Sequence, residues 1–145
     1  MYAELHCLSH FSFLRGASAP AELVSRAAEC RYHALAVTDE CSLAGVVKAH
    51  VAAKEHQLKL IIGSEFTLTE GIRLVALVPN REAYGELSGL ISRARRRCHK
   101  GEYTVHLRDI IFFFYFCFII TLAADTHNQI VSLLIVTRFY RGRLS

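Results

Sequence analysis

The chain has 145 residues, of which 52% are hydrophobic and 21% are charged, and its formal net charge is +4. This composition excludes an intrinsically disordered chain, and a net charge this small does not by itself indicate binding to nucleic acid. The length suits one domain or part of one, and five cysteines without a CxxC pair favour neither a disulfide framework nor a zinc ribbon. We therefore expect a reduced, cytoplasmic protein, and the N-terminal residues do not resemble a signal peptide.

The first part of the chain alternates between predicted strands and helices. Short apolar runs predict strands at residues 2–8, 34–38 and 58–66. Ser18 is expected to cap a first helix that has Pro20 and Glu22 in its first turn and ends near residue 30. Ser42 is expected to cap a second helix over residues 43–56, in which several residues recur at helical spacing: Val46, Val47, His50, Val51 and Lys54. Two successive strand–helix–strand units predict a parallel α/β arrangement with right-handed crossovers.

The connection changes at Glu70-Gly71, a turn signal that predicts the return of residues 72–78 as an antiparallel hairpin partner of the third strand. Asn80 then caps a helix that should run from Arg81 to about Arg96. Basic side chains gather at the end of this helix: Arg93, Arg95, Arg96, Arg97 and Lys100. Such cations complement the helix dipole on a solvated surface, and a patch that contacts phosphate is the alternative interpretation.

The character of the sequence changes after Asp109. Residues 110–124 contain no charged side chain, and a polar gap separates this run from the apolar residues 130–136. A membrane-spanning helix needs about 20 apolar residues, so this run is short for a membrane span and equally suits a buried strand or an aggregation-prone segment. We therefore divide the chain into an N-terminal part, 1–109, and a hydrophobic tail of uncertain origin, 110–145, which need not be the natural continuation of the domain.

Polar residues follow the predicted strands at their carboxyl ends, where α/β folds place their chemistry. His6 ends the first strand, Asp39 and Glu40 follow the second, and Glu65 lies near the end of the third. If the strands lie side by side, His6, Asp39, Glu40 and Glu65 point into one mouth. The imidazole and the three carboxylates could then bind a metal ion, or the carboxylates could act as a general acid/base pair. In the alternative interpretation His6 is a strand-end histidine with satisfied hydrogen bonds and Asp39 caps the loop that follows it.

Two features weaken the metal interpretation. A His-x-His pattern on a strand would place two imidazoles on one face, but Leu8 occupies the second position. Arg15 adds a fixed positive charge that would repel a neighbouring dication. We interpret His10 as an exposed loop residue, and without a metal ion Glu65 would pair with a cation such as Arg15 or Arg73.

Three segments, at residues 5–17, 34–45 and 61–66, resemble in order and spacing the opening of the polymerase and histidinol phosphatase (PHP) domain. This domain begins the C-family bacterial DNA polymerases, and the resemblance is strongest to their error-prone branch, which is implicated in damage-induced mutagenesis and translesion synthesis. The resemblance covers residues 1 to about 109. It implies an α/β fold that is a partial PHP-type (β/α) barrel, with mostly parallel strands, one hairpin and the hydrophobic tail.

In metal-binding members of the family, the first motif is His-x-His, the second ends in Thr-Asp-His and the third supplies a Glu. His6 and Glu65 match ligand positions, whereas Leu8, Arg15 and Glu40 stand where the family has ligands, and of these three only Glu40 could still coordinate. The resemblance therefore implies a degenerate site that holds no cofactor. If the site does bind a cation, a divalent metal such as Zn²⁺ or Mn²⁺ is expected at His6, Glu40 and Glu65.

The resemblance also implies a function. The chain is expected to be an inactive N-terminal fragment of a DNA-directed DNA polymerase. We expect the rest of the parent polymerase, and not this fragment, to bind DNA. Polymerase accessory proteins are further candidate partners. Membrane binding is not expected. The alternative function is a small stand-alone PHP-like metal-dependent phosphoesterase.

Overall fold

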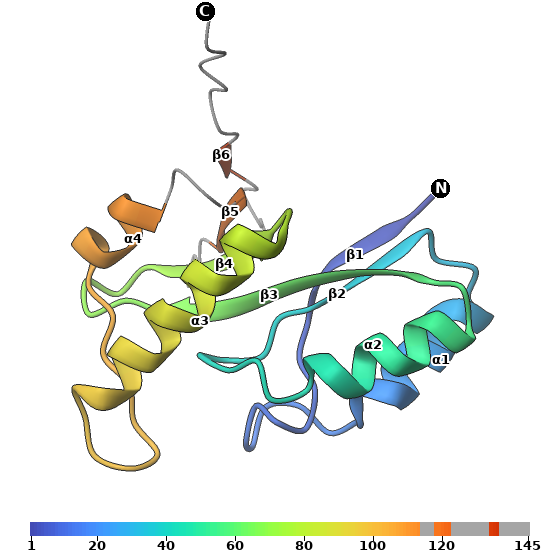
Figure 1. Ribbon diagram of the computed structural model, residues 1–145, viewed down its shortest axis with the longest axis horizontal. Helices are drawn as coiled ribbons and strands as arrows, with labels where there is room; N and C mark the ends of the chain where they lie inside the picture. The colour runs from blue at the N-terminus through green and yellow to red at the C-terminus, as the bar shows by residue number, and fades with distance from the viewer. Residues whose placement is uncertain (114–117, 123–133, 137–145) are drawn as a thin grey trace, which may run out of the picture.

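The computed structural model describes residues 1–113, 118–122 and 134–136, which form a curled sheet flanked by helices (Figure 1). The strands lie in the order β1-β2-β3-β4-β5-β6 across the sheet. Their bounds are Ala3–Cys7 (β1), Ala34–Val37 (β2), Lys59–Thr67 (β3), Arg73–Val78 (β4), Phe118–Leu122 (β5) and Leu134–Val136 (β6). The helices are Pro20–Glu29 (α1), Val46–Glu55 (α2), Arg81–Arg96 (α3) and Leu107–Phe113 (α4).

Three of the first four strands run parallel, as the alternation of strands and helices predicts. β1 pairs with β2 and β2 with β3 in parallel, through crossovers that contain α1 and α2. β4 returns antiparallel to β3 after a turn in which Gly71 has a φ of +82°, a conformation that favours glycine. The predicted α/β class, the parallel strands and the hairpin are confirmed, and the arrangement is that of a partial barrel.

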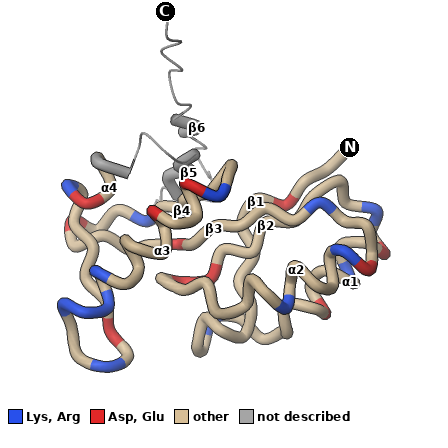
Figure 2. Tube along the Cα trace, viewed as in Figure 1, with Lys and Arg blue, Asp and Glu red and all other residues tan. Residues whose placement is uncertain are grey.

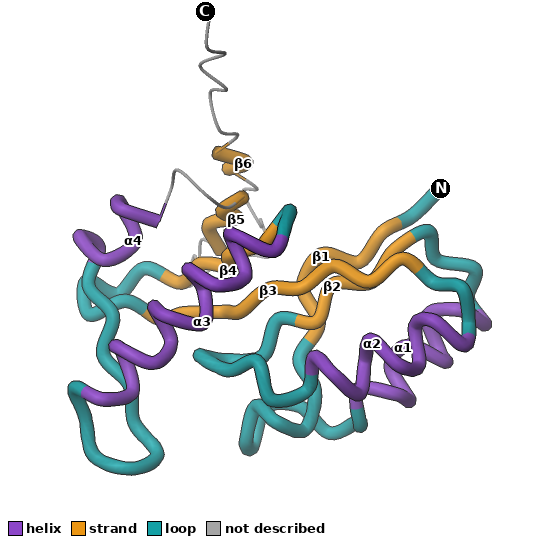
Figure 3. The backbone as a smooth tube through the Cα atoms, viewed as in Figure 1, coloured by secondary structure: helices purple, strands orange, loops and turns teal. Residues whose placement is uncertain are grey.

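The core lies on both faces of this sheet. α1 and α2 lie together against one part of the sheet, and α3 lies against β3 and β4 (Figure 3). Because successive strand residues point to opposite faces, Leu35 and Val37 pack toward α1 and α2, whereas Ala36 packs with Val75 and Leu77 on the other face. All four residues of β2 are buried, as expected for a parallel strand covered on both sides.

The first two helices begin later than the sequence predicts. Ala19 and not Ser18 is the N-cap of α1, and the backbone N–H of Ala19 donates to the Glu22 carboxylate over 2.8 Å. Glu22 therefore satisfies this terminal backbone group without a capping hydroxyl. α2 begins at Val46 after Gly45, because the hydroxyl of Ser42 accepts from Ala44 N in the preceding turn.

The buried face of α2 consists mainly of alanines. Val46 is buried, but Val47 and Val51 are 70% and 52% exposed. The buried positions of the helix interior are Ala49, Ala52 and Ala53, which pack with Ala27 of α1. Small side chains allow the two helices to approach closely, so the valine spacing identified a helix without identifying the side that it buries.

α3 has the predicted bounds and cap. The side chain of Asn80 accepts from Ala83 N over 2.9 Å, as expected for an N-cap. Leu87 and Leu90 are buried against β3 and β4 together with Ala94. The helix thus covers the sheet at its hairpin end, and of the basic residues in its last turn Arg93 and Arg96 are exposed, whereas Arg95 reaches the carbonyls of Glu40 and Cys41.

The segment after Asp109 joins the sheet. The boundary suggested at residue 109 falls within α4, whose Ile110 is fully buried in the core beneath α3. β5 then pairs antiparallel with β4, and β6 with β5, so a strand is confirmed in part of the apolar run. Within the described residues, no helix combines the length and apolarity needed to cross a membrane. Residues 114–117, 123–133 and 137–145 of the predicted tail lie outside the described part.

Candidate functional site

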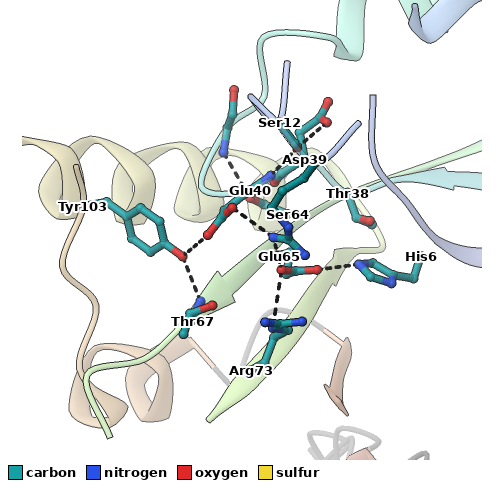
Figure 4. A network of polar contacts seen from close by, with 12 residues as sticks. His6, Ser12, Thr38, Asp39, Glu40, Ser64, Glu65, Thr67, Arg73 and Tyr103 are labelled. Atoms are coloured by element: carbon teal, nitrogen blue, oxygen red, sulfur yellow. Dashed lines mark hydrogen bonds and ion pairs between the residues drawn. The ribbon is translucent and has the colours of Figure 1, made fainter. Parts of the chain in front are cut away.

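The carboxyl ends of β1, β2 and β3 bring together the side chains of His6, Glu40 and Glu65, and we call this place the mouth (Figure 4). Glu40 forms an isolated parallel bridge with Glu65, so the two acidic residues are backbone neighbours. The Nε2 atom of His6 lies 2.6 Å from Oε2 of Glu65. The side chain of Glu65 is fully buried, whereas that of His6 is 33% exposed. His6, Glu40 and Glu65 therefore lie together at the strand ends, whereas the carboxylate of Asp39, expected in the same mouth, faces the loop after β1.

Arg15 lies between the two acidic side chains. Its Nη1 atom is 2.9 Å from Oε2 of Glu40 and 2.5 Å from Oε1 of Glu65. The Nε atom of Arg73 approaches the same oxygen of Glu65 at 3.8 Å. The interpretation in which Glu65 pairs with Arg15 or Arg73 is therefore confirmed for both arginines, with Arg15 much the closer partner.

The charges around Glu65 determine its ionisation. Burial alone would raise the pKa of Glu65, but hydrogen bonds from His6 and Arg15 outweigh burial and lower this pKa to about 2. An ionised carboxylate only accepts hydrogen bonds, so the Nε2 atom of His6 carries the donated proton. The hydrogen bond to Glu65 in turn raises the pKa of Arg15. The mouth is therefore a fixed ion-pair network at neutral pH.

A tight loop carries Arg15 into this position. Leu14 has a φ of +62°, which is unusual for a residue with a side chain, and Arg15 N donates to the Ser12 carbonyl over 3.0 Å. A Cβ atom on Gly16 would come within 2.0 Å of the Ser9 carbonyl oxygen, so this close approach requires glycine. The turn exposes Leu14 and directs Arg15 inward.

Asp39 holds this loop and does not join the ion-pair network. Its carboxylate is 1% exposed and accepts three hydrogen bonds of 2.7 Å, from the backbone N–H of Ser9 and from the hydroxyls of Ser9 and Ser12. The Ser64 hydroxyl donates to the Asp39 carbonyl over 2.7 Å. Asp39 was expected to cap the loop that follows it in sequence. Its carboxylate instead binds Ser9 and Ser12, so it stabilises the loop that follows β1.

Tyr103 and Arg95 complete the surroundings of Glu40, and sequence reasoning did not identify them as site residues. The Tyr103 hydroxyl donates to Oε1 of Glu40 over 2.9 Å and accepts from Thr67 N over 2.9 Å. Burial raises the pKa of Tyr103 to about 12, so its hydroxyl stays a donor at neutral pH. The Arg95 guanidinium lies 5.3 Å from the centre of the Tyr103 ring and donates to the carbonyls of Glu40 and Cys41.

The donor set of the mouth does not fit a bound metal ion. All four carboxylate oxygens of Glu40 and Glu65 already accept contacts, from Arg15, Tyr103 and His6. A dication would have to displace the Arg15 guanidinium from its position between the two carboxylates. In the described part of the chain, no three or more His, Cys, Asp or Glu side chains are grouped to hold a metal ion. His10 is exposed, as expected, and contributes nothing to the mouth.

Comparisons with known proteins agree with this fold. Residues 4–140 match the family model of the PHP domain. The error-prone DNA polymerase of Saccharophagus degradans is 53% identical over 144 residues, which are 99% of this chain and 14% of that protein. The error-prone DNA polymerase of Dechloromonas aromatica is 63% identical over 109 residues, covering 75% of this chain and 11% of that protein.

A solved structure supports the same relationship. A protein from Bifidobacterium adolescentis assigned as a metal-dependent phosphoesterase superposes with a TM-score of 0.55 at 28% identity, over 66% of this chain and 34% of that chain. The chain thus spans only 11% to 14% of the polymerases to which it is similar. The family match also runs past Asp109 into the tail, which the three sequence motifs did not predict. On these matches, the chain belongs to the PHP domain family.

Proposed function

We propose that the chain serves as the N-terminal PHP part of an error-prone DNA polymerase and is itself without catalytic activity. The observation that carries this proposal is Arg15, whose guanidinium bridges Glu40 and Glu65 where metal-binding relatives would need free ligands. The polymerases of similar sequence supply the identity of the parent. The parent would carry out template-directed DNA synthesis in the cytoplasm during damage-induced mutagenesis and translesion synthesis, with DNA and accessory proteins as partners.

The role of the mouth in this proposal is structural. His6 on β1, Glu65 on β3 and Arg73 on β4 join three strands, and Arg15 joins their ends to the loop after β1. Tyr103 extends the network to the segment after α3 through Glu40. A buried ion-pair network of this kind holds one arrangement of its segments, because separating any partner leaves a buried charge.

The test is an assay of the complete 145-residue chain. We expect no template-dependent nucleotide incorporation and no phosphate release from a phosphomonoester with Zn²⁺ or Mn²⁺. We also expect the same melting temperature with chelator as with either metal. Metal-dependent phosphate release that disappears in His6→Ala and Glu65→Gln, but persists in the control His10→Ala, would contradict the proposal.

The alternative function is a stand-alone PHP-like phosphoesterase that binds Zn²⁺ or Mn²⁺ through His6, Glu40 and Glu65. The likeness to the solved phosphoesterase structure favours it. The two proposals differ in the effect of Arg15. If the chain is an enzyme, Arg15→Ala should change an activity that the wild type already has. If the mouth is structural, the wild type is inactive and Arg15→Ala mainly lowers the free energy of unfolding.

A further inference from the structure

One short segment of the chain is strongly basic. Residues 93–109 carry six Lys or Arg and two Asp or Glu side chains, a net charge of +4. This equals the net charge of the whole chain, so the remaining residues carry cationic and anionic side chains in equal number. Figure 2 shows the cationic residues gathered at the end of α3 and in the loop that follows it. A small overall charge therefore conceals a strongly basic surface region.

Two arginines of this segment hold its loop in place. Arg95 donates to the carbonyls of Gly101 and Glu102 on the loop, as well as to those beside the mouth. Arg97 forms two hydrogen bonds with the carboxylate of Asp109, at 2.5 and 3.0 Å. Thr104 N donates to the carbonyl oxygen of residue 94 over 3.2 Å, which turns the chain back along α3. These contacts hold the backbone that carries the other Lys and Arg side chains of the segment.

The remaining cations of the helix end have no such partner. Arg93, Arg96 and Lys100, which we call the basic patch, are exposed, and none pairs with a carboxylate in the part of the chain that the structure describes. Arg93 and Arg96 lie one turn apart on α3, and Lys100 follows in the fixed loop. Cations held side by side repel one another, and this repulsion is relieved when a polyanion binds.

We propose that the basic patch binds the phosphate backbone of a nucleic acid without reading its sequence. Two of its three cations are arginines, whose planar guanidinium binds phosphate through paired hydrogen bonds. The patch has no aromatic side chain for stacking on bases, so the contact is expected to be electrostatic. The choice of nucleic acid over an acidic protein rests on the proposed polymerase function. The inference departs from the expectation that only the rest of the parent polymerase contacts DNA.

The experiment measures binding of the complete chain to fluorescein-labelled duplex DNA of about 20 base pairs by fluorescence anisotropy, from about 50 to 200 mM NaCl. Each phosphate contact contributes about 0.9 to the slope of log affinity against log salt concentration. The triple variant Arg93→Ala/Arg96→Ala/Lys100→Ala should therefore lose about 2 to 3 units of slope and bind roughly tenfold more weakly at the lowest salt. Arg93→Lys/Arg96→Lys keeps the charge and should keep most of the slope.

The matched control Lys54→Ala/Lys59→Ala/Arg81→Ala removes the same charge from exposed residues outside the segment. It should bind DNA as the wild type does. An equal loss of affinity in both triple variants, or no binding by the wild type, would overturn the inference. Competition by poly-glutamate as strong as that by unlabelled DNA of equal charge would assign the patch to an acidic protein instead. Circular dichroism checks that each variant is folded.

The outcome is independent of the test of the proposed function. If the chain releases no phosphate and binds no DNA, only the proposal that the basic patch binds nucleic acid is refuted. A chain that binds DNA through the patch and also releases phosphate with a metal ion refutes only the inactive mouth.

Discussion

Two buried carboxylates at the ends of neighbouring strands, Asp39 after β2 and Glu65 on β3, have very different surroundings. Asp39 accepts hydrogen bonds from neutral donors, all of which belong to Ser9 and Ser12 of one loop. Glu65 contacts cationic or ionisable side chains from three separate segments: His6, Arg15 and Arg73. The two side chains are 1% and 0% exposed, so burial does not distinguish them.

The difference shows how the same residue chemistry serves two purposes. Hydrogen bonds from neutral donors satisfy the buried carboxylate of Asp39. These bonds require the donors to lie in fixed positions, so Asp39 determines the conformation of one loop. Charged partners compensate Glu65 through opposite charge, so its contribution depends on pH and on every member of the network. The loop connects the two, because its serines contact Asp39 and its Arg15 contacts Glu65.

Asp39→Ala should have the largest effect on stability. The substitution removes the acceptor of three hydrogen bonds and leaves two buried serine hydroxyls without their partner. We expect the free energy of unfolding to fall by about 3 kcal/mol, measured by urea denaturation. The control Ser12→Ala removes one of these bonds, together with the bond that the Ser12 hydroxyl accepts from Glu40 N, and should cost about 1 to 2 kcal/mol. Equal costs for the two variants would show that Asp39 does not hold the loop as a unit.

Arg15→Met should have the next largest effect, because it leaves the buried Glu65 without its closest cation. Breaking a buried ion pair commonly costs 3–5 kcal/mol, but Arg15 is 31% exposed, so we expect about 2 kcal/mol. Thermal and urea unfolding measure this loss. The control Arg26→Met breaks an exposed pair with Glu29 and should cost less than about 0.5 kcal/mol. Similar losses in both variants would contradict a special role for Arg15.

Glu65→Gln should change the pH dependence of stability. The pKa of Glu65 is about 2 in the folded chain and 4.5 in its ordinary state, so its ionised form stabilises the fold fully above about pH 4.5. This contribution is lost as the pH falls from 4.5 towards 2. Between pH 5 and pH 3, urea denaturation should therefore show a shallower fall for Glu65→Gln than for the wild type, by on the order of 1 to 2 kcal/mol. Parallel curves would refute the charged description of this carboxylate.

Tyr103→Phe should have the smallest effect of the four. The change removes the hydroxyl that links Glu40 to Thr67 N, but Glu40 keeps its contact with Arg15. We expect a loss of about 0.5 to 1 kcal/mol in urea denaturation. Tyr84→Phe is the matched control, because the Tyr84 hydroxyl forms no hydrogen bond among the described residues, and it should be close to neutral. A larger loss of stability for Tyr84→Phe than for Tyr103→Phe would contradict a stabilising role for the Tyr103 hydroxyl.

Much of the fold could be predicted from local patterns. The strands, the hairpin at Gly71 and the cap at Asn80 depend on residues close together in sequence, and each was found where expected. The starts of α1 and α2 could not be predicted in the same way. Ser18 and Ser42 are suitable caps by residue type, but the position of a helix start also depends on which neighbouring groups satisfy its first backbone N–H groups.

The candidate site could be predicted in part for a similar reason. The convergence of His6 and Glu65 follows from the parallel order of the strands, and pairing with Arg15 was one of the two alternatives considered for Glu65. Tyr103 and Arg95 could not be found in this way. Arg95 reaches Glu40 from the last turn of α3 and Tyr103 from the segment that follows it, and no local periodicity relates residues that are more than 50 positions apart.

The position of Arg15 has a consequence for how the domain responds to its surroundings. A bound ion leaves when its concentration falls or when a chelator competes for it, so a fold that needs the ion depends on supply. The guanidinium between Glu40 and Glu65 is part of the chain, so dilution cannot remove it and its positive charge is retained at any physiological pH. On the proposal that the mouth holds no metal ion, we therefore expect its contacts to be the same in a cell starved of metal as in one with an ample supply.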